Sequence, residues 1–217
     1  MGTIKAVNPT VKWKRLKAAL VAAFLYFGRN MNQEKLFIYT MDMKYVRNLH
    51  NADDRVQSVS PQIHKSNRPF VGVVVVCNDH QYCIPIDSPK AKHYSMKNDV
   101  DFSRIFSGDK LIGVLNFNNM IPVDSTVIKK MNVRINKNDS QEVKAYKILC
   151  SKELDWIQKN QDAIIKKANK LYNMINSGKA NSSLKSRCLD FKKLETVLSK
   201  WQSKKNDTQN AEAKKAK

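Results

Sequence analysis

The residues best suited to chemistry in this chain come directly after an apolar run at residues 81–86. They are Ser88, Lys90 and His93, with Pro89 between the first two. A hydroxyl can donate to a phosphate oxygen, and an ammonium can offset the charge that builds on a pentacovalent phosphorus. An imidazole can serve as acid, base or phosphate ligand. The same residue types also occur in ordinary strand-end turns, so the spacing alone leaves both interpretations open.

Two further candidates, His64 and Arg68, lie in the polar segment 53–69 upstream of the apolar runs. The fixed fork of an arginine can clamp a phosphate, and two imidazoles that meet can cleave RNA by acid–base chemistry. The alternative is a solvated cation before a proline and a lone surface histidine. Sequence spacing does not show whether His64 and His93 meet.

A predicted β-hairpin must position these groups. Apolar runs at residues 70–77 and 81–86 are joined by a polar turn that begins with Asn78 and Asp79, a typical hairpin signal. Pro89 fixes its own φ and ends the hydrogen-bonded ladder, so we expect Ser88 and Lys90 to lie at the mouth of the sheet.

The periodicity of the rest of the chain predicts an α+β fold with a helical C-terminal part. Strands are expected at residues 36–40, 111–117, 120–123 and 133–135, and helices at 43–51, 143–176 and 189–201, the second broken near Ser151. We expect residues 31–202 to form a single domain. Residues 203–217 contain few apolar side chains and predict a disordered basic tail.

Residues 1–30 differ from the rest of the chain, because a basic stretch is followed by an apolar one. The pattern superficially matches a signal peptide but lacks a small-x-small cleavage site, and the apolar run is too short to span a bilayer. We favour Met31 as the biological start, with residues 1–30 as an upstream extension. A membrane-surface helix is the alternative.

The chain of 217 residues carries a formal net charge of +20, which favours a nucleic-acid partner over mere solubility. Residues 1–30 contribute +6 and residues 203–217 contribute +3, which leaves +11 on residues 31–202. The excess therefore predicts a basic surface on the folded domain. The four cysteines are spaced for neither a zinc site nor a redox motif, and indicate reduced thiols in a cytoplasmic protein.

A set of short segments, each weak alone, follows a distinctive order along the chain. They are residues 38–40, 44–46, 53–56, 68–72, the Ser88-Pro89-Lys90 motif with His93, and the run 112–123. Together they resemble the ToxN/AbiQ family, over about residues 35–201. These are toxins of type III toxin–antitoxin systems (ToxN-, CptN- or TenpN-like), and some act in abortive infection as a phage defence.

The resemblance implies a strongly curved antiparallel sheet, a partial barrel similar to the Kid/MazF toxins, flanked by helices. It implies an endoribonuclease that needs no metal or other cofactor and cuts single-stranded, often adenine-containing RNA. Attack by the ribose 2′-OH would leave a 2′,3′-cyclic phosphate and a 5′-OH. Besides cellular mRNA, the implied partner is a repeated pseudoknot antitoxin RNA that the toxin trims. This RNA would then inhibit the toxin in a closed ring, with three copies of each expected.

The resemblance also assigns catalytic positions. Lys90 matches the family's catalytic lysine, Ser88 its neighbouring serine and Tyr45 an active-site tyrosine. Arg68 falls where some members have lysine, so it keeps the charge and changes the geometry.

The remaining matched positions are expected to contact RNA. Asp87 falls where some members have threonine, and His64 where some have tyrosine. Asn118 and Asn119 lie in an Asn-rich bend expected to touch bases. Lys92 and His93, which follow the catalytic lysine closely in the sequence, complete this set.

Three other functions remain open from the sequence. A non-catalytic RNA-binding protein would share the charge without needing the pair Ser88 and Lys90. A membrane-surface protein would use residues 1–30 and the basic face. A metal-dependent nuclease is disfavoured because the acidic residues are scattered along the chain.

Overall fold

The computed structural model of the protein describes residues 35–57, 71–77 and 80–215. From Leu36 onward these residues belong to one compact unit. The expectations for residues 1–30, His64 and Arg68 lie outside the described residues. No helix in the described part of the chain is long and apolar enough to cross a membrane.

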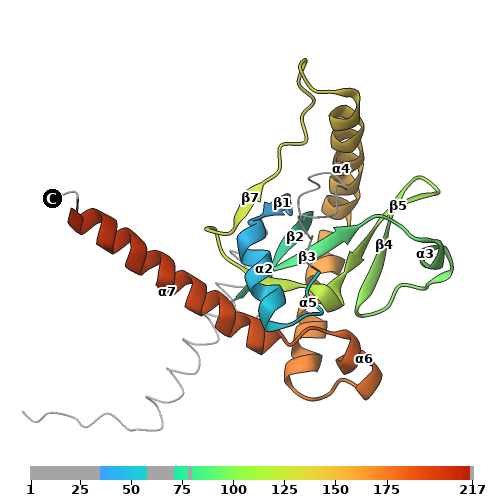
Figure 1. Ribbon diagram of the computed structural model, residues 1–217. Helices are drawn as coiled ribbons and strands as arrows, with labels where there is room; N and C mark the ends of the chain where they lie inside the picture. The colour runs from blue at the N-terminus through green and yellow to red at the C-terminus, as the bar shows by residue number, and fades with distance from the viewer. Residues whose placement is uncertain (1–34, 58–70, 78–79, 216–217) are drawn as a thin grey trace, which may run out of the picture. The chain divides into compact units, whose positions relative to one another are not determined.

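Seven strands form one antiparallel sheet (Figure 1). They are β1 (Ile38–Met41), β2 (Val71–Cys77), β3 (His80–Asp87), β4 (Phe102–Ser107), β5 (Lys110–Asn116), β6 (Ile121–Val123) and β7 (Ile128–Lys130). The order is β4-β5-β3-β2-β1-β7, and β6 pairs with β3 beside this path. The predicted hairpin of residues 70–77 and 81–86 is confirmed as β2 and β3.

The central strand β3 changes partners along its length. On one side it pairs with β2 from His80 to Pro85. On the other side its start pairs with β6 through Gln81 to Cys83, and its end pairs with β5 through Ile86 and Asp87. Pro85 lies just before the change, and proline has no N–H to donate to a ladder. β3 therefore supports two different neighbours at its two ends.

The sheet is open and is not strongly curled, so the predicted strongly curved partial barrel is corrected. Closure requires the two edge strands to pair. Here β4 and β7 are the opposite ends of the strand order. The fork at β3 uses its free side for β6 and β5 in turn, which divides the sheet instead of rolling it into one continuous surface.

Helices cover the sheet and close the core. They are α2 (Met43–Ala52), α3 (Ala91–Ser95), the 3₁₀ turn η1 (Phe117–Asn119), α4 (Gln141–Lys159), α5 (Gln161–Asn176), α6 (Ser182–Arg187) and α7 (Phe191–Lys215). α4 packs on β4 and β5, α5 packs on β2, and α7 contacts both α2 and β6. Tyr82, Tyr172 and Phe191 join β3, α5 and α7 in one buried aromatic cluster.

Several boundaries differ from the sequence predictions for local reasons. The long helix breaks at Asn160 and not near Ser151, because the Asn160 side chain donates to the Trp156 carbonyl at the helix end. β4 was not predicted, although Gly108, at a φ of 58°, supplies the tight turn that joins it to β5. α3, α6 and β7 were also not predicted at these positions. The backbone of α7 continues through residues 203–215, where disorder was expected.

The sheet leaves no space for a side chain at Gly72. A Cβ atom there would lie 2.5 Å from the Ile84 carbonyl oxygen and would also collide with the Cys83 sulfur. Gly72 pairs with Pro85 across the hairpin, so this close approach sets how tightly β2 lies against β3. The hairpin that carries the candidate chemistry therefore depends on this glycine.

Candidate active site at the end of β3

The candidate chemistry lies where β3 leaves the sheet. Ser88 and Lys90 are exposed and Pro89 between them is half-buried, while the residues of β3 from Tyr82 to Pro85 are buried. Among the described residues, neither the Ser88 hydroxyl nor the Lys90 ammonium makes a hydrogen bond or ion pair. Both groups are thus presented to solvent from a rigid strand end.

His93 holds the backbone of Lys90. Its ring Nδ1 accepts a hydrogen bond from the backbone N–H of Lys90 at 3.0 Å. The backbone N–H of His93 donates to the Lys90 carbonyl at 2.8 Å. His93 is 5% exposed, and its ring packs against Phe102 of β4 with the ring centroids 5.4 Å apart. His93 was predicted to contact RNA, but the structure buries it beneath the lysine because α3 must pack on β4.

The electrostatic surroundings keep His93 neutral. Burial lowers the pKa of its imidazole, the cations Lys92 and Lys90 lower it further, and Asp87 raises it. Nδ1 can accept from an N–H only when it carries no proton. The hydrogen bond and the direction of the pKa shift therefore agree on a neutral ring.

Asp87, the last residue of β3, is engaged by its neighbouring strand. The Asn116 amide at the end of β5 donates a hydrogen bond to the Asp87 carboxylate. Asn116 was not among the predicted residues; its place just before the bend at Asn118 was the available signal. An acid tied in this way is oriented within the sheet, beside Ser88.

Tyr45 lies elsewhere. Its side chain is fully buried, and its hydroxyl donates to the Pro122 carbonyl of β6 at 2.8 Å. Burial raises the pKa of this hydroxyl, and Asp124 raises it further. β6 pairs with the start of β3, whereas Lys90 follows its end. The predicted catalytic tyrosine thus supports the core, because α2 must bury this face against β6 and α7.

The two asparagines of the predicted RNA-binding bend also differ. Asn118 donates through its amide to the Arg187 carbonyl, and its own carbonyl accepts from the Leu189 N–H. Through its side-chain amide and its backbone carbonyl, Asn118 therefore ties the bend to the segment that precedes α7. Asn119 is half-buried and makes no side-chain hydrogen bond within the described residues.

The surface beside Lys90 combines cations with an aromatic ring. Lys92 is exposed on α3, and Tyr94, also on α3, is 64% exposed. The Tyr94 carbonyl accepts from Arg104 of β4 at 3.2 Å, so the backbone under this ring is fixed. Tyr94 was missed in the sequence because a lone tyrosine after a histidine gives no signal of exposure.

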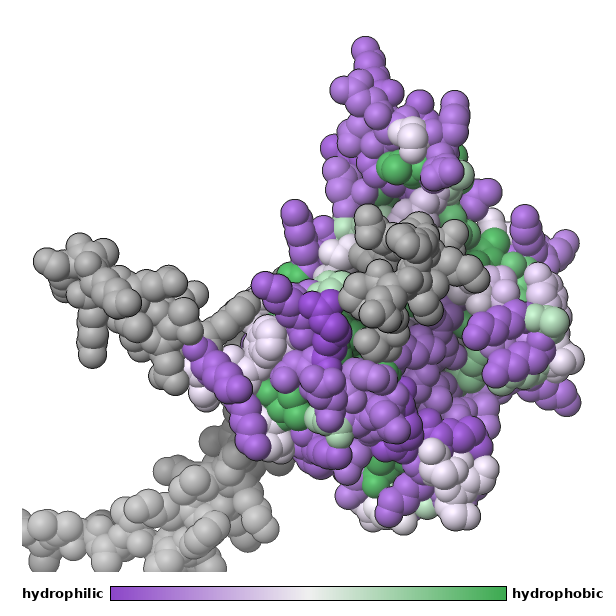
Figure 2. Space-filling model, viewed as in Figure 1, coloured by the Kyte–Doolittle hydropathy of each residue, from purple (hydrophilic) through white to green (hydrophobic). Residues whose placement is uncertain are grey.

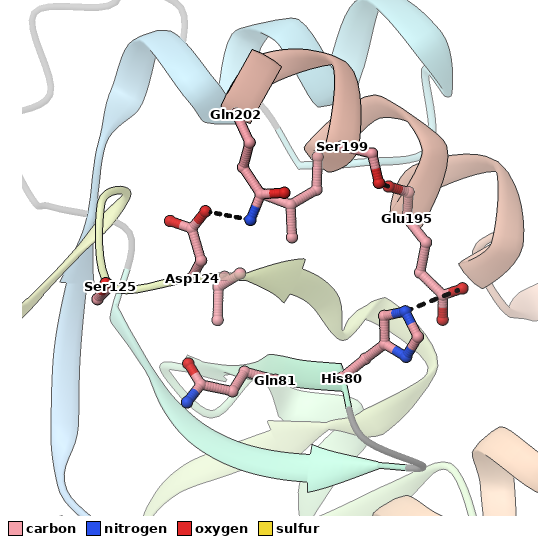
Figure 3. Close-up of a pocket in the computed structure, with 9 residues that line it drawn as sticks. His80, Gln81, Asp124, Ser125, Glu195, Ser199 and Gln202 are labelled. Atoms are coloured by element: carbon pink, nitrogen blue, oxygen red, sulfur yellow. Dashed lines mark hydrogen bonds and ion pairs between the residues drawn. The ribbon is translucent and has the colours of Figure 1, made fainter. Parts of the chain in front are cut away.

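A polar pocket of about 420 Å³ lies at the other end of β3, against α7 (Figure 3). Its polar lining residues are His80, Gln81, Asp124, Ser125, Glu195, Ser199 and Gln202. His80 and Glu195 face each other with 3.8 Å between Nε2 and Oε2, and Gln202 donates to Asp124 at 2.6 Å. The side chains of these pairs are directed toward one another.

Neither region gathers metal ligands. No group of three or more His, Cys, Asp or Glu able to hold a metal ion occurs within residues 35–57, 71–77 and 80–215. The face shown in Figure 2 is mostly hydrophilic, as the high charge of the chain predicts. Metal independence stays a prediction.

Comparison with known proteins decides the family. The family model of the ToxN toxin of type III toxin–antitoxin systems matches residues 37–199. The chain belongs to this family. Endoribonuclease ToxN of Bacillus thuringiensis subsp. kurstaki is 31% identical over 169 residues, covering 76% of this chain and 83% of that protein. The predicted family and the prediction of an endoribonuclease are thereby confirmed.

Solved structures agree with this assignment to the ToxN family. A structure from work on type III systems, describing toxin inhibition by a non-coding RNA pseudoknot, has a TM-score of 0.63 at 28% identity. It covers 78% of this chain and 99% of that chain. AbiQ, a lactococcal anti-phage endoribonuclease, has a TM-score of 0.66 at 21% identity with the same coverage, and this likeness shows the fold alone.

Proposed function

We propose that this ToxN-family protein is a metal-independent toxin that cleaves single-stranded RNA at the exit of β3. The ribose 2′-oxygen attacks the adjacent phosphorus and loses its proton. The bond from phosphorus to the 5′-oxygen breaks, and that oxygen takes up a proton. The products carry a 2′,3′-cyclic phosphate and a 5′-OH. Because RNA supplies its own nucleophile, the protein has only to align it and stabilise charge.

Lys90 is the proposed electrostatic catalyst, and Ser88 its partner in binding the phosphate. The observation that carries the proposal is their joint exposure at a strand end where neither group is used by the described residues. One charged donor aimed at a developing charge supplies about 10²–10³ in rate. Arg68, outside the described residues, remains a proposed second cation for the phosphate.

The RNA strand is proposed to continue from Lys90 along the exposed side of α3. Lys92 offers a cation for the next phosphate, and the exposed Tyr94 ring offers a flat surface for an unpaired base. Aromatic rings stack on any base, which suits single-stranded RNA. Asn119, half-buried and without a side-chain hydrogen bond among the described residues, remains a proposed base contact.

The proposed substrates are cellular mRNA in the cytoplasm, cut often at adenine-containing sites, and a repeated precursor of the antitoxin. The processed pseudoknot RNA is proposed to inhibit the toxin in a closed ring of alternating protein and RNA, and the pair to act in phage defence. The support is the ToxN family itself together with the solved relative whose toxin is inhibited by a non-coding RNA pseudoknot.

End-group analysis of cleaved RNA tests this proposal. The full chain and its Lys90→Ala variant are incubated in EDTA with a defined unpaired RNA rich in adenine. The expected result is 2′,3′-cyclic phosphate and 5′-OH ends from the wild type, with the rate reduced at least about 100-fold in the variant. Lys110→Ala, which replaces an exposed lysine at the start of β5, is the matched control and is expected to cleave normally.

The competing function is a basic protein that binds RNA without cutting it. Intact RNA in every lane, with tight binding retained, would replace the proposed activity by this one. Cleavage that stops in EDTA and returns with a divalent cation would instead identify a metal-dependent nuclease. Equal rates for the wild type and Lys90→Ala would remove Lys90 from the mechanism.

A further inference from the structure

The lysine proposed to be catalytic has its backbone fixed by one buried ring. Lys90 is the residue before α3, where backbone N–H groups have no partner within a helix. Its N–H is satisfied by His93 Nδ1 at 3.0 Å, and its carbonyl by the His93 N–H. This pair of hydrogen bonds, the His93 clasp, lies between β3 and α3. It sets the direction in which the Lys90 side chain leaves the strand.

We propose that His93 is a positioning residue for Lys90, and that the His93 clasp opens when the imidazole is protonated, which switches off cleavage at acidic pH. This inference rests on the proposed function, because it assigns a regulator to the same lysine. The ligand of His93 is the protein backbone and not RNA. Its role is to restrict Lys90 to the orientation from which the ammonium reaches the phosphate.

The groups around the ring determine the sign of the pH effect. Lys90 and Lys92 of its own segment and Asp87 of β3 are the charged groups that face it, and Phe102 of β4 covers the ring. Burial is the largest of these influences and lowers the pKa of His93 below its usual value of about 6.5. The clasp is therefore closed at neutral pH and opens as the pH falls through this lowered pKa.

A catalytic role for His93 is the main competing interpretation. Nε2, the other ring nitrogen, makes no hydrogen bond within the described residues, and such a nitrogen could carry a proton to the leaving oxygen. The two roles differ in what can replace the histidine. A clasp needs only an acceptor at the position of Nδ1, whereas an acid needs a group that gains and loses a proton.

Two substitutions of the full chain separate these roles. Asparagine places its Oδ1 close to the position of Nδ1, so His93→Asn keeps the acceptor without any proton to exchange. His93→Phe keeps a ring against Phe102 and removes the acceptor. We expect kcat to fall about 10- to 100-fold in His93→Phe with KM changed less than about 2-fold, because a misdirected lysine stabilises the transition state less and leaves substrate binding unaffected. His93→Asn is expected to keep kcat within about 3-fold of the wild type.

The pH profile supplies the second readout. The wild type is expected to lose kcat below the pKa of His93, and His93→Asn is expected to lack this acidic limb, since an amide does not titrate. A His93→Asn variant as slow as His93→Phe would overturn the inference in favour of an acid or base. A His93→Phe variant with wild-type kcat would also overturn it.

A measurement without cleavage keeps this inference distinct from the proposed function. The chain has four histidines, and the His93→Asn spectrum identifies the signal of His93 among them. In ¹⁵N-histidine-labelled full chain, we expect this ring at pH 7.5 as the neutral tautomer with its proton on Nε2. A charged ring, or a proton on Nδ1, would overturn the clasp. If the wild type does not cleave RNA, the proposed function is overturned, while the tautomer result for His93 still stands.

Discussion

The two ends of β3 hold polar groups in opposite ways. The strand is eight residues long, so the ends lie about 23 Å apart. At its start, Glu195 accepts from Tyr82 and Tyr172 at 2.7 Å each and from Lys192 at 2.9 Å. At its exit, the Ser88 and Lys90 side chains make no hydrogen bond within the described residues. One end is a closed polar cluster, and the other is an open one.

The difference separates stability from function. A buried charge is tolerated only when it is fully hydrogen-bonded, and Glu195 meets this condition with three partners. Charges that satisfy each other have little left for a ligand. The exposed Lys90 costs nothing to leave unpaired in water and keeps its full charge for a phosphate. The hydrogen-bonded polar residues beside the pocket of Figure 3 therefore stabilise the fold. The exit of β3, where Ser88 and Lys90 are exposed, is the better candidate for the active site.

The largest effect is expected from a substitution at the open end of β3. Lys90→Ala removes the proposed charge stabilisation, so we expect cleavage to fall about 10²- to 10³-fold while the free energy of unfolding changes by less than about 0.5 kcal/mol. Single-turnover cleavage and urea unfolding measure the two quantities. A variant that loses stability and activity together would show that the exit is as structural as the start.

The next-largest effect is expected from a substitution at the closed end of β3. Glu195→Gln keeps Oε1 for the tyrosines but places an NH₂ group opposite Lys192, so we expect a loss of about 1.5–3 kcal/mol in stability with kcat unchanged. Burial raises the pKa of Glu195, but hydrogen bonds from Lys192, Tyr82 and Tyr172 outweigh it and hold the pKa below its usual value. The stabilisation is thus present above about pH 4.5 and is lost as the pH falls through the lowered pKa.

Urea unfolding of Glu195→Gln at pH 7 provides the measurement. Glu142→Gln is the control, because Glu142 is an exposed carboxylate in the first turn of α4. A fall in kcat for Glu195→Gln at full folding would connect the two ends of β3 and contradict their separation.

A second buried carboxylate, on the helix that packs on β4 and β5, provides a contrast to Glu195. Glu153 of α4 is 5% exposed, and its Oε1 lies 2.7 Å from where a Cβ on Gly113 would be, so it fills the space over that glycine. Burial raises its pKa to about 7. The folded state therefore holds a proton that the unfolded state releases near pH 4.5, and stability falls as the pH rises between these values.

Glu153→Gln removes this titration. We expect the variant to be more stable than the wild type at pH 8 by up to about 3 kcal/mol, and nearly equal to it at pH 4.5. Unfolding at the two pH values gives the comparison. Equal stabilities at pH 8 would mean that Glu153 is ionised at no cost, as the well-paired Glu195 is.

The smallest effect concerns RNA affinity at the open end. Tyr94→Ala removes the proposed stacking surface, and stacking contributes about 1–3 kcal/mol per base, so we expect RNA affinity to fall about 5- to 100-fold. Binding of an RNA with 2′-fluoro riboses, which lacks the nucleophile, and 2-aminopurine fluorescence measure this. Tyr94→Phe should bind as the wild type does. Ile135→Ala, a similarly exposed apolar residue, serves as the control, and an equal loss in it would remove Tyr94 from the RNA surface.

Local patterns were enough for much of the fold. Alternation and turn residues predicted β2, β3, β5 and β6, and the 3.6-residue period predicted the helical second half. The sheet order was not readable, because strand pairing joins residues far apart in sequence. The strongly curved sheet that the family resemblance implied was wrong, because the change of partner along β3, which follows Pro85, depends on which strands pair with it.

The sequence by itself determined the chemistry that the chain can offer. Its charge, its hairpin and the run from Ser88 to His93 favoured an RNA-directed protein, and the ordered set of short segments from residue 38 to residue 123 carried the resemblance to the ToxN family, because residue types and spacing are local properties. Only the tertiary structure decided which of these groups face solvent. It buried Tyr45 and His93 and left Lys90 exposed, since burial depends on which elements pack together. That packing turned His93 from an expected RNA contact into the support of the lysine beside it.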